Sequence, residues 1–175
     1  MRDADRLARF EQAVLPHLGA AYNLARWLTR SDHDAEDVVQ EAYLRAVKFF
    51  GGFHGADGRS WLLAIVRNTC YTWLEQHRAR QRPAAFDEEV HGMASEAGNP
   101  ETLLARKEDQ QTVRRAVEEL PLELREAIVL RELEGLSYKE IAAVAGIPLG
   151  TVMSRLARAR QRLQQCLGAA GEREA

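Results

Sequence analysis

The stretch SYKEIAAVAGIPLGTVMSRLARARQRL, residues 137–163, decides the fold of the C-terminal part of this chain. Ser137 and Glu140 have the S-x-x-E spacing of a capping box, in which each side chain bonds a free backbone N–H at a helix start. Gly146 suits a turn that needs a positive φ. Pro148 suits the first turn of a following helix, because it has no backbone donor to lose there. The stretch therefore predicts two helices joined by a tight turn.

The second of these helices carries two different faces. Apolar residues recur at i, i+4, i+7 and i+11, and they predict a stripe that faces a core: Val152, Leu156, Ala159 and Leu163. Another face is polar and cationic, and its members are Thr151, Ser154, Arg155, Arg158 and Arg162. This layout is typical of a helix-turn-helix whose second helix enters a DNA major groove.

An ordinary helical hairpin with a solvated basic face would explain the same spacing. Such a helix usually interleaves charges of both signs to gain i,i+4 pairs. Residues 141–171, however, contain several arginines and no Asp or Glu. A stripe of one sign is better explained by phosphates that lie opposite it.

The charges of the chain are segregated along its length. The 175 residues include 24 basic and 26 acidic side chains, for a formal net charge of −2. Residues 58–82 hold five arginines and one acid, whereas residues 83–101 hold five acids and no Lys or Arg. We expect two basic surfaces joined by an acidic connector, so the near-neutral sum says little about binding.

Several classes of protein are disfavoured by the composition. The two cysteines match no ligand or redox spacing and indicate a reduced, cytoplasmic protein. The five histidines are scattered, and neither a Walker-type loop nor G-x-S-x-G occurs, so we expect no metal site, no cofactor and no enzyme activity. The first ten residues lack an apolar export segment, and the longest apolar run, residues 61–66, is too short for a bilayer. Membrane insertion is therefore not expected.

Helical periodicity dominates the sequence, which predicts an all-α fold of two small helical domains joined by a flexible linker. Helices are expected over about residues 6–30, 31–50 and 59–77, and again from about residue 101. Pro16 is expected to bend or interrupt the first helix, and Ser31 or Asp32 to cap the second. Pro121 is expected to start the helix before the helix-turn-helix, and Gly135 to end it. Residues 82–100 have linker composition; a tether between two DNA-binding domains and a plain solubilising linker both fit it.

The helix expected over residues 59–77 also has two sides. Its apolar stripe is typical of a core: Trp61, Leu62, Ile65, Val66, Thr69, Trp73 and Leu74. The opposite side carries Arg67, Asn68, Tyr71, Glu75 and Arg78. Aromatic and amide side chains among arginines can stack on exposed bases and bond their edges. An amphipathic helix with one isolated tyrosine would give the same pattern.

Taken together, the chain resembles the extracytoplasmic-function sigma factors of bacterial RNA polymerase. The resemblance lies in DAEDVVQEAYLRAVKFF (34–50), GRSWLLAIVRNTCYTWL (58–74) and LPLELREAIVLRELEGLSYKEIAAVAGIPLGTVMSRLARARQRL (120–163). It runs from about Phe10 to Leu167 in the order of the family. It implies a region 2 domain at residues 1–82, an acidic linker at 83–111 and a region 4 domain at 112–170.

The resemblance also implies roles for single residues. Asp37, Gln40 and Glu41 match the D-x-x-Q-E pattern of the helix that binds the clamp helices of core polymerase. Residues implied to bind the −10 element as a single strand are Arg59, Arg67, Asn68, Tyr71 and Arg78, with the 51–60 loop holding an extruded base. The Thr151–Arg162 face would read the −35 element as duplex. Met153 stands where many members of the family carry Lys or Arg.

The partners implied are core RNA polymerase, promoter DNA and an anti-sigma factor. Promoter opening would come from preferential binding of the opened strand, without nucleotide hydrolysis by this chain. Two alternatives remain open: a stand-alone helix-turn-helix transcriptional regulator that dimerises on a palindrome, and a helical adaptor that binds only protein.

Overall fold

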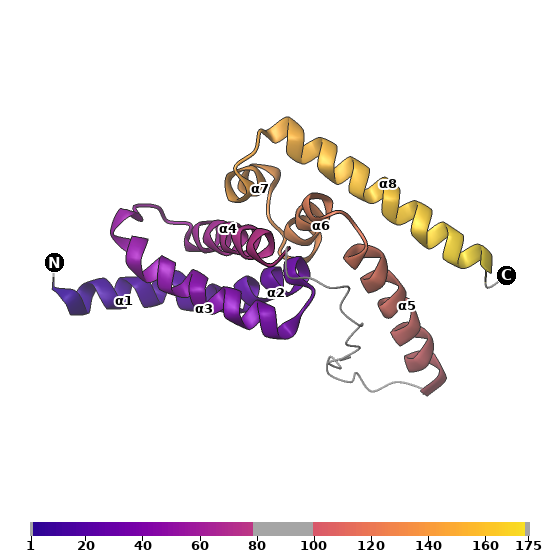
Figure 1. Cartoon of the computed structure of the whole chain (residues 1–175), viewed down its shortest axis with the longest axis horizontal. Coiled ribbons are helices and arrows are strands. Elements are labelled where there is room, and N and C mark those ends of the chain that lie inside the picture. The colour runs from indigo at the N-terminus through magenta and orange to yellow at the C-terminus, as the bar shows by residue number, and fades with distance from the viewer. Residues whose placement is uncertain (1, 79–99, 174–175) are drawn as a thin grey trace.

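The computed structural model describes residues 2–78 and 100–173, and all regular secondary structure in these two ranges is helical (Figure 1). The elements are α1 (Asp3–Val14), η1 (Leu15–His17), α2 (Leu18–Thr29), α3 (Asp32–Phe49), η2 (Phe50–Gly52), α4 (Gly58–Arg78), α5 (Pro100–Glu118), α6 (Leu122–Ile128), η3 (Val129–Leu133), α7 (Tyr138–Ala145) and α8 (Leu149–Arg173). The all-α prediction is confirmed. Most of the predicted linker, residues 83–99, lies outside the described residues. Helix α5 begins within the remainder, and the domain boundaries stay a prediction.

Local signals explain the helix ends of the N-terminal half. Pro16 lies in the 3-10 turn η1, which separates α1 from α2 as predicted. Arg30 ends α2 with a φ of 59°, and Ser31 then caps α3, its Oγ accepting a hydrogen bond from the backbone N–H of Asp34. These caps turn the chain sharply, so that α2, α3 and α4 pack together around one core. That core includes Leu24, Leu28, Val38, Leu62, Leu63 and Val66.

Gly58 permits a close approach between two helices. A Cβ at this position would lie 2.2 Å from the backbone oxygen of Ala13, near the end of α1. No side chain fits at that distance. The N-terminus of α4 is therefore held directly against α1, and this contact fixes where the loop before α4 runs.

The helix-turn-helix begins and turns where predicted, but its second helix, α8, continues past the predicted end at residue 163 to Arg173. Ser137 and Glu140 form the reciprocal capping box at the start of α7, and Gly146 ends α7 with a φ of 66°. Helix α8 leaves the turn at 102° to α7. In the predicted core stripe of α8, Val152, Leu156 and Ala159 are fully buried, and Leu163 is partly buried against the same core.

The helix before the helix-turn-helix differs from the prediction in its last turn. Pro121 directly precedes α6, as expected, but residues 129–133 form a π-helical turn, η3. Gly135 has a φ of 67°, and the backbone N–H of Leu136 reaches back to the carbonyl of Leu130 at 3.0 Å. The chain therefore closes this end with a widened turn and a left-handed glycine.

The two halves pack against each other. Helix α4 lies against α7, and α2 lies against α6, so the N-terminal helices meet the C-terminal half at the centre of the molecule (Figure 1). Helix α8 runs along the far side of the C-terminal half and faces away from α1–α4. In the described part of the chain no single helix is long and apolar enough to cross a membrane; the bent pair of α7 and α8 passes on length and composition only.

Candidate functional site

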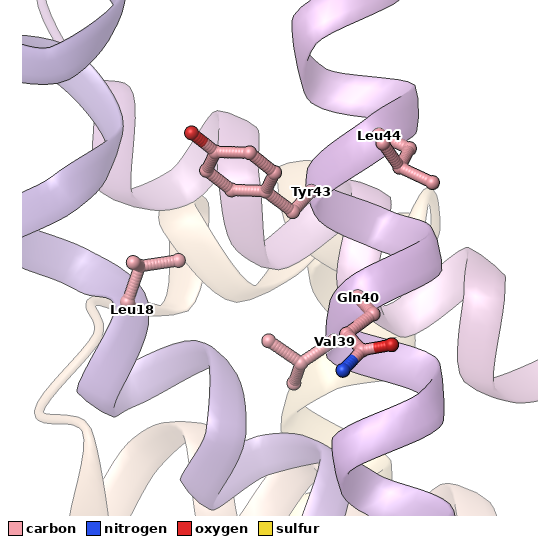
Figure 2. Close-up of a pocket in the computed structure, with 5 residues that line it drawn as sticks. All are labelled: Leu18, Val39, Gln40, Tyr43 and Leu44. Atoms are coloured by element: carbon pink, nitrogen blue, oxygen red, sulfur yellow. The ribbon is translucent and has the colours of Figure 1, made fainter.

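The first candidate surface is a polar ridge on α3 beside an apolar groove. The implied polymerase-binding residues Asp37, Gln40 and Glu41 are all exposed on this helix. Next to them, an open groove of about 400 Å³ runs between α2 and α3. Figure 2 shows its lining residues, with Val39 and Tyr43 pointing from α3 toward α2; the lining consists of Leu18, Val39, Gln40, Tyr43 and Leu44.

Several apolar side chains on these elements are exposed. Leu44, which lines the groove, is 67% exposed, and Leu15 in η1 and Val47 in α3 are exposed as well. Sequence analysis missed this patch. The available signal was Leu44, an apolar residue three positions after Glu41 on the same helix. Together with the polar ridge, the patch gives α3 an amphipathic outer face that suits the docking of another helix.

The second candidate surface is the polar side of α4. The Arg67 guanidinium lies 3.7 Å from the ring centroid of Tyr71, and its Nη1 donates a hydrogen bond to Asn68 Oδ1 at 3.3 Å. The structure thus brings these three predicted residues together as one stacked group. Asn68 is exposed, and so is Arg78, the last residue of α4.

A carboxylate from the other half of the chain meets this group. Arg67 Nε donates to Glu126 Oε1 at 2.6 Å, and the Tyr71 hydroxyl donates to Glu126 Oε2 at 2.8 Å. Glu126 is almost completely buried. Burial, together with the negative charge of Glu126, raises the pKa of Tyr71 above its ordinary value. Burial alone would lower the pKa of Arg67, but its hydrogen bond to Glu126 and the carboxylate charge leave the pKa raised.

Arg59, at the start of α4, also faces the C-terminal half. Its Nη2 donates to Glu140 Oε2 at 3.3 Å, and its Nη1 donates to the backbone carbonyl of Glu134 at 3.2 Å. The preceding loop is anchored by Asp57, which accepts from the backbone N–H of Ser60 at 3.0 Å. The hydrogen bonds from Ser60 lower the pKa of the Asp57 carboxyl.

The third candidate surface is the outer face of α8. Ser154, Arg158 and Arg162 are exposed on it, and Thr151 is half-buried. Arg155 differs, since only 14% of its side chain is exposed and its Nη2 lies 3.6 Å from Glu123 Oε2. Three of the five predicted residues are therefore exposed, while Arg155 is directed toward Glu123 on α6.

A buried arginine lies where the two halves meet. Arg125 Nη1 donates to the backbone carbonyls of Glu118 and Leu120, and its Nη2 donates to the carbonyl of Leu28 in α2, at 3.2 Å. Burial and the nearby charge of Arg30 lower the pKa of Arg125 to about 10. Sequence analysis missed this residue, because a single arginine on a helix carries no signal of its partners. Within residues 2–78 and 100–173, no group of three or more His, Cys, Asp or Glu could hold a metal ion.

Comparison with known families finds two separate matches along the chain. Residues 13–80 match the family model for Sigma-70 region 2, and residues 110–163 match the model for Sigma-70, region 4. These matches carry the implied −10 and −35 surfaces respectively.

Individual relatives give the same result. The chain is 42% identical to the ECF RNA polymerase sigma-E factor of Escherichia coli over 135 residues, which cover 73% of this chain and 71% of that protein. It is 34% identical to the ECF RNA polymerase sigma factor SigE of Mycolicibacterium smegmatis over 165 residues, covering 94% of this chain and 64% of that protein. The chain thus spans about two thirds of the length of these relatives.

Two solved structures resemble the whole chain. The sigma factor RpoE of Bartonella quintana, solved in complex with the anti-sigma factor NepR, has a TM-score of 0.72 at 32% identity and covers 91% of this chain and 97% of its own. CnrH, solved in complex with the cytosolic domain of CnrY, has a TM-score of 0.64 at 27% identity and covers 95% of this chain and 99% of its own.

Proposed function

The chain belongs to the extracytoplasmic-function sigma factors, and from this premise we propose that it binds core RNA polymerase and directs it to specific promoters. The observation that carries the proposal is the presence, in one chain, of a region 2 match and a region 4 match, the latter with an exposed polar and cationic face on α8. A promoter must be found as duplex and then opened. Two modules, one for each form of DNA, suit that sequence of events.

We assign polymerase binding to α3. Its exposed Asp37, Gln40 and Glu41 supply acceptors and an amide, and the adjoining groove supplies apolar area that a partner helix can cover. A docking site with a buried apolar centre and a polar rim has the general anatomy of protein–protein interfaces. The core enzyme would provide the partner helices.

We assign −35 binding to α8. Arginine can pair with two acceptor atoms of guanine in the major groove, and serine can contact a base or a phosphate. Arg158, Ser154 and Arg162 are exposed for this purpose, with Thr151 beside them at the N-terminal end of the helix. Arg155 would act there mainly by holding α8 on α6 through Glu123.

We assign −10 binding to the polar side of α4. The stacked pair of Arg67 and Tyr71 offers a platform for an unpaired base, and Asn68 offers both a donor and an acceptor for a base edge. Arg59 and Arg78 would bind phosphates at the two ends of α4. Binding the opened strand on this side offsets the few kcal/mol needed to unstack a base.

An anti-sigma factor is the expected regulator. RpoE of Bartonella quintana, which resembles this chain along most of its length, was solved in complex with the anti-sigma factor NepR, and the similar CnrH was solved in complex with the cytosolic domain of CnrY. We propose that the region 2 domain spans residues 1–82 and the region 4 domain residues 112–170, with an acidic linker at 83–111. The regulator would then hold both domains at once.

Footprinting on promoter DNA, with and without core enzyme, tests the function. We expect protection of −35 and opening at −10 only when core enzyme is present. Asn68→Ala should reduce opening while leaving the amount of chain bound to core enzyme unchanged. A two-fold symmetric footprint from the chain alone would instead identify a stand-alone regulator, and failure to associate with core enzyme would contradict the proposal.

A further inference from the structure

The side of α4 that we assign to the −10 strand is partly covered by the C-terminal half of the chain, at Arg67 and Tyr71. Glu126, on α6, accepts hydrogen bonds from both Arg67 and Tyr71, and is 1% exposed. A carboxylate and a phosphate are both anionic, acceptor-only groups. Glu126 therefore occupies the Nε–H of Arg67 and the hydroxyl of Tyr71, two donors that a DNA strand could use.

In neighbouring contacts, too, a carboxylate of the C-terminal half accepts hydrogen bonds from the N-terminal half. Glu140 accepts from Arg59 Nη2 at 3.3 Å and from the Ser60 hydroxyl at 3.4 Å. The side chain of Glu134 accepts from Asn23 Nδ2 at 2.7 Å. In each pair the donor belongs to α2 or α4, and the acceptor belongs to the C-terminal half. In these contacts the N-terminal half supplies donors and the C-terminal half supplies carboxylate acceptors, and two of them, Arg67 with Glu126 and Arg59 with Glu140, are ion pairs.

We propose that this packing is a closed form of the sigma factor in which Glu126 acts as an internal competitor of the −10 strand. The inference rests on the proposed role of α4. The Arg67 Nε–H and the Tyr71 hydroxyl cannot donate to Glu126 and to DNA at once, so a strand that uses these two donors requires the two halves to separate. A protein whose binding-competent state is only a fraction of the population shows an affinity reduced by that fraction.

Separation is compatible with the chain length. Residues 79–99 connect α4 to α5, and 21 residues can span roughly 70 Å when fully extended. Asn68 and Arg78 stay exposed in the closed form, so a strand can reach α4 before Glu126 leaves. Once Arg67 turns to DNA, the buried carboxylate loses its partner, which is strongly unfavourable and drives the halves further apart.

The test compares Glu126→Ala with Glu132→Ala in the full chain. Both variants remove one acid, but Glu132 pairs with Arg160 of the same half, at 3.2 Å, and is not among the residues that bond α4. Small-angle X-ray scattering measures closure, and fluorescence anisotropy measures binding of a short labelled single-stranded DNA of mixed sequence without polymerase. We expect Glu126→Ala to be more extended and to bind the strand about tenfold more tightly than the unaltered chain. Glu132→Ala should match the unaltered chain in both measurements.

A cross-linked form supplies the opposite perturbation. Asn23→Cys and Glu134→Cys, in a Cys166→Ser background, can be joined by a short bis-maleimide, and we expect the joined chain to lose strand binding. Unchanged scattering for Glu126→Ala, or equal strand affinity after opening or cross-linking, would overturn the closed form. Because footprinting with core enzyme is independent of these assays, a failure here is distinguishable from a failure of the proposed function.

Discussion

Arg155 Nη2 lies 3.6 Å from Glu123 Oε2, which ties α8 to α6 through an arginine in the middle of the polar face. Its Nη1 is buried, with no hydrogen-bond partner among the described residues. Arg158, one turn later, is exposed, and its Nε donates to the backbone carbonyl of Ser154. Two arginines three residues apart therefore have different surroundings, and different effects are expected when each is removed.

Arg158→Ala should weaken binding to duplex −35 DNA by about 1–3 kcal/mol, because an exposed arginine on this face can pair with a base. Arg155→Ala should instead lower the free energy of unfolding by about 1 kcal/mol, since the packed stem and the ion pair are lost. Anisotropy with matched and scrambled −35 duplexes, and urea unfolding, separate the two effects. Arg160→Ala, on the side facing Glu132, serves as the control. Equal loss of matched and scrambled binding for Arg158→Ala would show that it contacts only phosphate.

Local signals made much of the fold predictable. The break at Pro16, the cap at Ser31, the capping box at Ser137 and the turn at Gly146 each depend on one residue and its immediate neighbours. Such features can be predicted from short stretches of sequence, because a free N–H group or a positive φ favours only a few residue types at that position.

The contacts between the halves were not predictable in the same way. Arg67 and Glu126 are 59 residues apart, and nothing near either residue specifies the other. The same holds for Arg125 and the carbonyl of Leu28. The sequence indicated only that Arg67 belongs to a polar face, and an arginine can bind either a DNA phosphate or a carboxylate. The partner of Arg67 in the free chain, Glu126, follows from the packing of α4 against the C-terminal half.

Ser137→Ala should lower the free energy of unfolding of the C-terminal half by about 1 kcal/mol, because the backbone N–H of Glu140 in the first turn of α7 loses its acceptor. Urea unfolding followed by circular dichroism measures this change. Thr112→Ala is the matched control: Thr112 is exposed in α5, and its hydroxyl bonds only the carbonyl one turn earlier. Equal effects of the two substitutions would contradict a stabilising role for the cap.

Two glycine substitutions should have opposite effects. Gly58→Ala should destabilise the N-terminal half by about 1–3 kcal/mol, because its Cβ would overlap the carbonyl of Ala13. Gly19 lies in α2, and a Cβ there meets nothing within 4 Å, so Gly19→Ala should stabilise by about 0.5–1 kcal/mol. Thermal unfolding of both variants measures these changes. An unchanged stability of Gly58→Ala would mean that α1 and α4 can move apart without lowering the free energy of unfolding.

The two cysteines should differ in reactivity. Burial raises the pKa of the Cys70 thiol to about 12, whereas Cys166 is exposed on α8. Since the thiolate is the reactive form, a maleimide at pH 8 should label Cys166 rapidly and Cys70 only when the N-terminal half opens. Mass spectrometry over time, with Cys166→Ser as the control, follows each site. Rapid double labelling of the folded chain would contradict the buried position of Cys70.

Acid should weaken the start of α7. Hydrogen bonds from Ser137, with a contribution from Arg59, lower the pKa of the Glu140 carboxyl below its ordinary value. A lowered pKa in the folded state means that Glu140 contributes stability above the ordinary carboxylate pKa and loses it as the pH falls through the folded value. The gap in unfolding free energy between the unaltered chain and Glu140→Ala should therefore be present at pH 7 and shrink below about pH 4.5. Glu132 takes no part in this cap, so the gap in unfolding free energy between the unaltered chain and Glu132→Ala should show no comparable change with pH. A gap for Glu140→Ala that stays constant on acidification would show that the charge of Glu140 is not what stabilises α7.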